Sequence, residues 1–270
     1  MSAATTTPLP TRAAVMAQAR DENFPVASRL LARGTRGHLM AIYGFARLID
    51  DVGDEAQGDR LALLDDIERQ LDALYAGAVP EHPVLRALAP TVRACALPAE
   101  PFRRLIEANR RDQEVTSYET FDELLGYCRL SAAPVGELVL HVFGAATPQR
   151  IALSDRVCAG LQVTEHLQDV AEDHARGRVY LPREDLARFG CGEEELASGG
   201  PALRAVLSFE AQRARALLDA GAPLARQLPW RARLAIAGFV AGGRTALEAL
   251  GAQRSRRAFA LAFLRAVAAR

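Results

Sequence analysis

The chain contains no lysine, so all 33 of its basic residues are arginine. This absence excludes a phosphate-binding loop of the Gly-Lys-Ser/Thr type and any mechanism that needs a lysine Schiff base. The 33 arginines are balanced by 33 acidic residues, so the chain as a whole has no field that attracts a polyanion. We therefore expect no nucleic-acid partner.

Cysteines and long apolar runs are also scarce. The four cysteines lie about thirty residues apart without a Cys-x-x-Cys pair, which indicates reduced thiols and neither a zinc site nor a disulfide framework. The longest apolar stretches, such as LAIAGFVAGG, stop near ten residues, too short to span a bilayer. Residues 1–15 lack the apolar core of a signal peptide, and we expect them to be loosely ordered. These features predict a soluble cytoplasmic protein.

A helical period dominates what is present. Apolar residues recur at spacings of three and four, alternating strand patterns are nearly absent, and no linker or fixed repeat divides the chain. We therefore predict one all-α domain over residues 1–270, built from nine to eleven helices. The helical segments are expected at 13–24, 37–52, 60–77, 102–113, 121–144, 151–173, 202–228, 231–253 and 256–269.

Pro134 lies inside one of these segments, where a proline removes a backbone hydrogen bond. It predicts either a plain break between two shorter helices or a bend that widens a cavity, and the sequence favours neither. In the second case Val135, Leu138 and Val142 would line that cavity.

Two acidic segments raise the question of function. LIDDVGDE at 48–55 carries Asp50 and Asp54, and LQDVAED at 167–173 carries Asp169 and Asp173. Residues four apart share a helix face, and a like-charged pair there costs roughly 0.2–0.5 kcal/mol, or several kcal/mol per ion if it is buried. A cation between the carboxylates would remove this cost. Mg²⁺ prefers oxygen ligands and commonly uses one or two carboxylates together with substrate phosphates.

Other polar residues extend both acidic faces. Tyr43 and Arg47 precede the first pair, whereas Gln162 and His166, bordered by Glu165, precede the second. We predict that the two faces clamp a diphosphate through Mg²⁺, with arginines on its outer oxygens. The candidate arginines are Arg36, Arg47 and Arg178. By contrast, the acids Asp65, Asp66 and Glu68 indicate a solvated face that is paired to arginines.

These segments resemble the two aspartate-rich signatures of the squalene and phytoene synthase family. In the second signature the aspartates are followed by GRVYLP at 177–182 in the expected register, and AIYGFARLIDD at 41–51 also matches. The resemblance runs from about Glu22 to the last long helix. It implies a single-domain isoprenoid synthase helical bundle with a central cavity, in which prenyl diphosphates bound through Mg²⁺ form or rearrange carbocations.

Within this family the likeness is strongest to the bacterial hydroxysqualene synthases of the hopanoid pathway, through ENFPVAS at 22–28 and YCRLSAAPVG at 127–136. This likeness implies conversion of presqualene diphosphate and water to hydroxysqualene. Glu165 stands where many condensing relatives have asparagine, so Glu165 or His166 could orient or deprotonate the water. Glu165 could instead be a spectator or support the metal from behind its ligands, and for His166 alone packing against a neighbour is favoured. Asp112 would border the cavity, or pair at the surface with Arg110 or Arg111.

Several alternatives remain open at this point. The chain could instead condense two molecules of farnesyl diphosphate, or longer substrates as in phytoene synthesis, or be a non-catalytic assembly protein, although such relatives typically lose the aspartates. A di-iron bundle would need Glu-x-x-His pairs, which neither acidic segment contains. FGCGEE at 189–194 lacks a preceding strand, so no NADPH is expected. The basic, amphipathic residues 254–270 are either the last helix or a peripheral contact with the inner face of the membrane.

Overall fold

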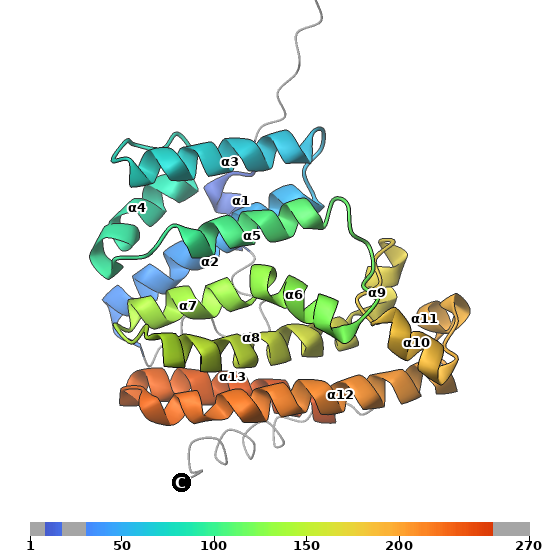
Figure 1. Cartoon of the computed structure of the whole chain (residues 1–270). Helices are drawn as coiled ribbons and strands as arrows, with labels where there is room; N and C mark the ends of the chain where they lie inside the picture. The colour runs from blue at the N-terminus through green and yellow to red at the C-terminus, as the bar shows by residue number, and fades with distance from the viewer. Residues whose placement is uncertain (1–8, 18–30, 251–270) are drawn as a thin grey trace, which may run out of the picture. The chain divides into compact units, whose positions relative to one another are not determined.

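The computed structural model describes residues 9–17 and 31–250 (Figure 1). Its described part is all-α, as predicted, and the one extended pairing there is an isolated bridge between Ser117 and Val179. The helices are α1 (Arg12–Ala17), α2 (Arg33–Asp54), α3 (Arg60–Tyr75), α4 (Pro83–Cys95), α5 (Glu100–Arg111), α6 (Phe121–Ser131), α7 (Ala133–Val142), α8 (Pro148–Gln168), α9 (Val170–Ala175), α10 (Arg183–Phe189), α11 (Glu193–Ser198), α12 (Pro201–Gly221), the 3₁₀ helix η2 (Ala222–Gln227) and α13 (Trp230–Glu248).

The chain forms two compact units, and the first consists of residues 1–114 with 141–144. In this unit α2 packs against α3, α4 and α5. Its apolar face is buried because Leu, Ile, Val and Phe recur at helical spacing, and Phe45 meets Phe102 of α5 edge to face at 4.9 Å between ring centroids. The solvated acidic face predicted on α3 is confirmed, because Arg110 of α5 binds both Asp65 and Glu68 at 2.6 Å.

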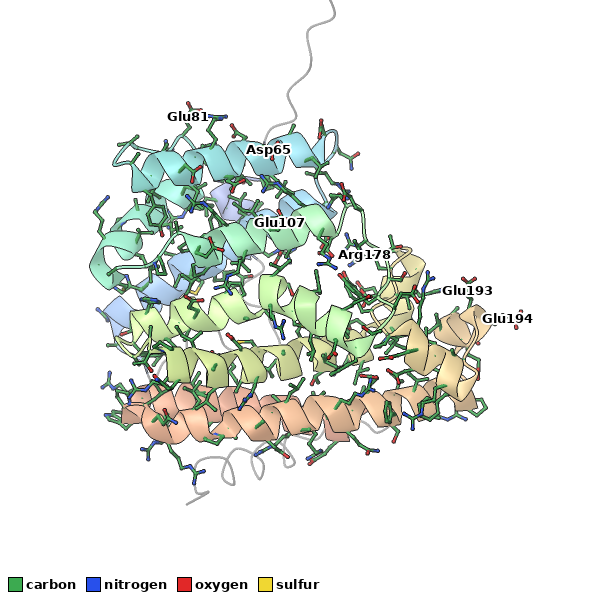
Figure 2. The ribbon with its side chains drawn as sticks, viewed as in Figure 1. Asp65, Glu81, Glu107, Arg178, Glu193 and Glu194 are labelled. Atoms are coloured by element: carbon green, nitrogen blue, oxygen red, sulfur yellow. The ribbon has the colours of Figure 1, made fainter. Side chains whose placement is uncertain are left out.

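The second unit consists of residues 115–140 with 145–270. Its longest packing interface joins α8 to α12, which run side by side in Figure 1, and α13 packs against both. Gly160 lets α8 approach α12 closely, since a Cβ there would lie 2.8 Å from Leu218 and 3.1 Å from the carbonyl of Ala214. At the edge of this unit, Glu193 and Glu194 of α11 point into solvent (Figure 2).

Several predicted helix boundaries were wrong. The described residues contain thirteen α-helices, whereas nine to eleven helices were predicted. Three of them, α9, α10 and α11, are short helices of six or seven residues. The helix predicted over 202–228 becomes 3₁₀ after Gly221. Helix α4 was missed, since its prolines indicated a break. Pro83 instead occupies the first turn, where a missing N–H costs nothing, while Pro90 is tolerated inside the helix.

The run 121–144 is also interrupted. Helix α6 ends at Ser131 and α7 begins at Ala133, so Pro134 stands in the first turn of a new helix. Between the two interpretations of Pro134, the structure therefore supports a break. Gly136, two residues later, allows α7 to lie close to α8, because a Cβ there would come within 2.6 Å of the Cys158 sulfur.

At the N-terminus, residues 1–8 lie outside the described part, but the expectation of loose order does not hold from Arg12 onward, where α1 begins. Val15 is fully buried, and His82 contacts the carbonyl of Pro10 at 3.0 Å. The predicted helix at 256–269 lies outside the described residues, and the single domain over 1–270 stays a prediction. No helix between residues 9 and 17 or 31 and 250 has the length and apolar character needed to cross a bilayer.

Candidate active site

The first acidic pair lies in the last turns of α2, and the end of this helix is held firmly. Arg60 donates from its three guanidinium nitrogens to the carbonyls of Gly53, Asp54 and Ala56 at 2.9–3.0 Å. These carbonyls would otherwise lack partners at a helix end. The turn that carries the carboxylates is therefore fixed through its backbone carbonyls.

Asn109 of α5 sets the position of Asp50. Its side-chain amide donates to the Asp50 carboxylate at 3.2 Å, and Gln113 donates to the carbonyl of Gly53 at 3.0 Å. Gly53 makes this approach possible, because a Cβ at that position would collide with the Asn109 side chain. Glycine is thus required here by space, and not by its backbone angles.

The Asp50 carboxyl group is difficult to ionise. Solvent reaches its side chain, yet crowding by protein atoms raises its pKa from 3.8 to about 7; the neighbouring charge of Asp54 adds to this, while the Asn109 hydrogen bond opposes it. A cation bound beside Asp50 would favour its ionised form.

Arg47 is engaged differently from the prediction. Its Nε lies 2.7 Å from the buried Asp51 and its Nη2 lies 3.2 Å from Glu55. Asp51 lies four residues after Arg47 and so competes for it with any bound anion. Arg36, Tyr43 and Asp50 follow one another at intervals of seven residues and therefore share one face of α2. Arg36 and Tyr43 are partly exposed.

The second acidic pair is built on a broken helix. The structure ends α8 at Gln168, and Asp169 has φ −105° and ψ 12° before α9 begins. The continuous helix predicted over 151–173 was therefore wrong. One turn is still preserved across the break, since the amide of Asp173 donates to the carbonyl of Asp169 at 2.8 Å. The two aspartates consequently remain one turn apart.

Two arginines influence this second pair. Desolvation and the charge of Asp169 raise the pKa of Asp173 from 3.8 to about 6, against the lowering effect of Arg176 and Arg178. Gly177, at φ +78°, reverses the chain after α9, and the amide of Arg178 then donates to the carbonyl of Asp173 at 2.9 Å. This turn brings the backbone of Arg178 back to Asp173, and the predicted contact of Arg178 with a diphosphate stays a prediction.

His166 is a buried, neutral imidazole. Burial lowers its pKa from 6.5 to about 3. Its ring stacks on Tyr180 at 3.9 Å, and its Nε2 lies 3.2 Å from the Gln162 amide. Its Nδ1 lies 3.9 Å from Asp173. The alternative that His166 packs against a neighbour is thus supported, whereas a role as general base is not.

A small pocket lies beside this pair, inside the second unit. Of the predicted residues, it brings together His166, Asp173 and Arg178, and His174, Tyr180 and four aliphatic residues complete its lining. Glu165 is exposed on the last turn of α8, and its carbonyl accepts from the amide of Asp169 at 3.1 Å. Glu165, Asp169 and Asp173 therefore follow one another at single-turn intervals.

The residues present fit the predicted Mg²⁺. No group of three or more His, Cys, Asp or Glu side chains that could hold a metal exists within the described residues. Each pair offers two carboxylates one helical turn apart, and burial raises the pKa of one of them, Asp50 or Asp173. This arrangement suits a cation that takes its remaining ligands from water and phosphate.

The sequence pattern of the squalene/phytoene synthase family matches residues 17–267. The chain belongs to this family. Its members are isoprenoid synthases that act on prenyl diphosphates. The predicted family is thus confirmed, and with it the isoprenoid-synthase helical fold.

Individual relatives agree with this assignment. A hydroxysqualene synthase of Rhodopseudomonas palustris is 38% identical over 215 residues, 77% of this chain and 72% of the relative. A phytoene synthase of Mycobacterium bovis is 37% identical over 199 residues, 71% of this chain and 65% of the relative. The crystal structure of the squalene synthase HpnC from Alicyclobacillus acidocaldarius is 42% identical, with a TM-score of 0.81 over 87% of this chain and 89% of that one.

The remaining candidates lie on α5 and α7. Asp112 forms the C-terminal cap of α5, three residues after Asn109, and is partly buried. Its predicted surface partner Arg110 instead binds acids of α3 and Glu107. Val135 is partly exposed in the first turn of α7, and Leu138 is fully buried.

An aromatic cluster was missed by the sequence analysis. Tyr118, Tyr127 and Tyr180 are buried and lie 5.5–6.1 Å apart between ring centroids, and His166 joins them through Tyr180. The bridge between Ser117 and Val179 places two of these tyrosines together. The three tyrosines are spread over 63 positions of sequence, so no local period could have indicated the cluster.

Proposed function

We propose that this protein converts presqualene diphosphate and water into hydroxysqualene and diphosphate. The single observation that carries the proposal is the ladder of Glu165, Asp169 and Asp173, one turn apart and next to the buried aromatic cluster. All three residues belong to the second unit. Asp169 and Asp173 can retain a diphosphate through a cation, and Glu165 can receive a proton. The hydroxysqualene synthase relatives support the same reaction.

In this mechanism Asp50, Asp54, Asp169 and Asp173 would hold Mg²⁺ against one diphosphate. When bound, the metal would neutralise the charge that develops on the leaving group. Arg178 would contact an outer oxygen of the diphosphate, and Arg36 would do the same from α2. Arg47 would have to leave Asp51 or Glu55 in order to contribute.

The reaction then breaks the carbon–oxygen bond of the substrate, and diphosphate departs with the bonding electrons. The tyrosine cluster offers electron-rich ring faces that stabilise a neighbouring cation. After rearrangement, the oxygen of one water bonds to the carbocation, and a proton of that water passes to the Glu165 carboxylate. Tyr43 would help to orient the substrate from α2, and Gln162 would orient the water. His166, being neutral, would support Tyr180 and would not transfer a proton.

The test is incubation of the purified protein with Mg²⁺, without nucleotide, and with each candidate diphosphate in turn. We expect presqualene diphosphate to yield hydroxysqualene that carries ¹⁸O when the reaction is run in H₂¹⁸O. Farnesyl diphosphate alone should remain unconsumed. Asp169→Asn serves as the inactive control, and Glu165→Gln should still release diphosphate but form less alcohol. Squalene formed only when NADPH is added would contradict both the proposed product and the expectation that no NADPH is needed.

A second candidate function is the condensation of prenyl diphosphates, because phytoene synthases are similar to this chain at 37% identity. Consumption of farnesyl diphosphate, or of its C20 homologue, in the same assay would establish this function instead. Retention of all four aspartates argues against a non-catalytic assembly protein, as does the family to which the chain belongs.

A further inference from the structure

The basic residues are unevenly distributed along the chain. Residues 220–270 contain nine arginines and a single acid, Glu248, although the whole chain has equal numbers of the two charges. Between Asp219 and Glu248 there are four arginines and no acid. The C-terminal fifth is therefore strongly basic, which is a property that attracts anionic partners.

The chain's only tryptophan lies within this basic region, at the first residue of α13. Trp230 is 60% exposed, and the Arg231 guanidinium lies over its ring, 4.9 Å from the centroid. Arg226, at the end of η2, is exposed as well. Arg226, Trp230 and Arg231 are defined here as the Trp230 patch.

The patch is built on a firm base. Leu224 and Ala225 are buried immediately before the patch, Leu228 is buried between Arg226 and Trp230, and Ala232 is buried immediately after the patch. Arg233 donates to the carbonyl of Arg226 at 3.3 Å. Its tryptophan is thus exposed by the packing of its neighbours. An exposed indole ring covered by one guanidinium, with no carboxylate bound to Arg226 or Arg231 within the described ranges, combines the two side-chain types that favour an anionic interface.

We propose that the Trp230 patch docks the protein onto an anionic phospholipid bilayer. Tryptophan favours the membrane–water interface, where its ring lies at headgroup level, and arginine binds phosphate through its planar fork. Each basic residue near an anionic membrane surface contributes about 1 kcal/mol, equivalent to about fivefold in affinity. The patch combines one exposed ring with two arginines, and its charge is complementary to such a surface.

The patch is well separated from the acidic ladder along α8. Gly221, which immediately precedes η2, packs against Leu153 and Val157 in the first half of α8, whereas Asp169 follows the end of that helix. Substitutions in the patch should therefore leave the acidic pairs intact. The proposal also does not depend on the proposed reaction, since it requires no substrate.

Trp230 provides its own probe, because it is the sole tryptophan. The full-length protein is titrated with vesicles of phosphatidylcholine alone and of phosphatidylcholine with 30% phosphatidylglycerol, at low and at high salt. We expect a blue shift of the tryptophan emission with the anionic vesicles only, quenching by brominated lipid, and loss of binding at about 0.5 M salt, where charges are screened within a few ångströms. Binding to anionic vesicles without a shift or quenching would overturn the proposal, because another segment would then make the contact.

Variants complete the test by vesicle sedimentation. Arg226→Gln with Arg231→Gln should weaken binding about 25-fold, and Trp230→Ala should weaken it several-fold. Arg204→Gln, an exposed arginine at the start of α12, is the matched control and should lower affinity by no more than about twofold. Circular dichroism and thermal unfolding verify that each variant is folded. Equal weakening by the control, or unchanged binding of the double variant, would show that the contact is not made through this patch.

Discussion

The two acidic pairs have the same spacing in sequence but are supported by different structures. Asp50 and Asp54 lie on an unbroken helix whose end is fixed by Arg60, and Asn109 contacts one of the carboxylates. Asp169 and Asp173 lie on either side of a helix break, beside a pocket and a turn that brings Arg178 back. Similar chemistry is thus presented once by a rigid helix end and once by a turn.

This difference suggests different tasks for the two regions. The first pair is surrounded by contacts that fix position, whereas the second adjoins Arg178, Glu165 and the aromatic cluster. If both hold the same diphosphate, the first region mainly anchors it, and the second region also governs what happens to the carbon skeleton. Substitutions in each region test whether the two regions have these separate tasks.

Removal of one carboxylate from either pair should be the most damaging change. We expect Asp50→Asn and Asp169→Asn each to lower kcat on the order of 10³-fold, because oxygen ligands for the cation are lost where negative charge develops. Thermal unfolding should be unchanged or shifted upward, since like-charge repulsion is relieved. The control is Asp66→Asn on α3, whose activity should remain normal because Asp66 is paired with Arg69. Loss at only one pair would show that the pairs do not share a substrate.

Gly53→Ala should damage the first region selectively. The new methyl group would collide with Asn109, so we expect a loss of about 1–3 kcal/mol in the free energy of unfolding, together with reduced turnover. In the second region Gly177→Ala is the comparison. No atom lies within 4 Å of the position that its Cβ would take, and only the φ of +78° opposes a side chain there. That change should cost about 1 kcal/mol. Denaturant unfolding of both variants measures the contrast, and an equal cost would refute it.

Arg178→Gln should raise KM for the diphosphate substrate about tenfold, because a charge-assisted contact to an anion is lost. The matched variant is Arg176→Gln, which removes an exposed arginine that pairs with Glu172 at 2.8 Å within one helix turn. It should have little effect, since exposed pairs contribute less than about 1 kcal/mol. Steady-state kinetics of the two variants distinguish them, and similar KM values would remove Arg178 from the site.

The smallest predicted effect concerns His166 and pH. Its pKa is lowered from 6.5 to about 3 in the folded protein, so above pH 6.5 both the folded and the unfolded states are neutral. As the pH falls below 6.5, only the unfolded state gains a proton, and wild-type stability should fall relative to His166→Phe by up to about 1.4 kcal/mol per pH unit. Unfolding measured between pH 5 and 8 tests this. If the stabilities of wild type and His166→Phe change in parallel with pH, folding does not lower the pKa of His166.

Local patterns predicted much of the molecule correctly. The helical period, the faces of α2 and α8, and the pairing of the α3 acids depend on residues three and four apart, which the sequence displays directly. Boundaries were less accurate. Helix α4 was not predicted, because the cost of a proline such as Pro83 or Pro90 depends on its position within a helix, and that position is known only once the bounds of the helix are known.

For the site, spacing singles out the four aspartates and Arg178 as candidates, but spacing cannot select among partners. Arg47 has acids at several nearby positions, and it pairs with Asp51 and Glu55 in the structure. The neutral state of His166 arises from burial against Tyr180, a residue fourteen positions away, so it could not be read from the motif.

The class of the fold and the spacing of the two acid pairs follow from the amino-acid chain alone, because both depend on the fixed geometry of a helical turn. The break at Asp169, the assembly of the tyrosine cluster and the contact of Asn109 with Asp50 arise only in the folded molecule. These features join residues distant in sequence, and their energies come from burial and from close packing that exists only after the chain has folded.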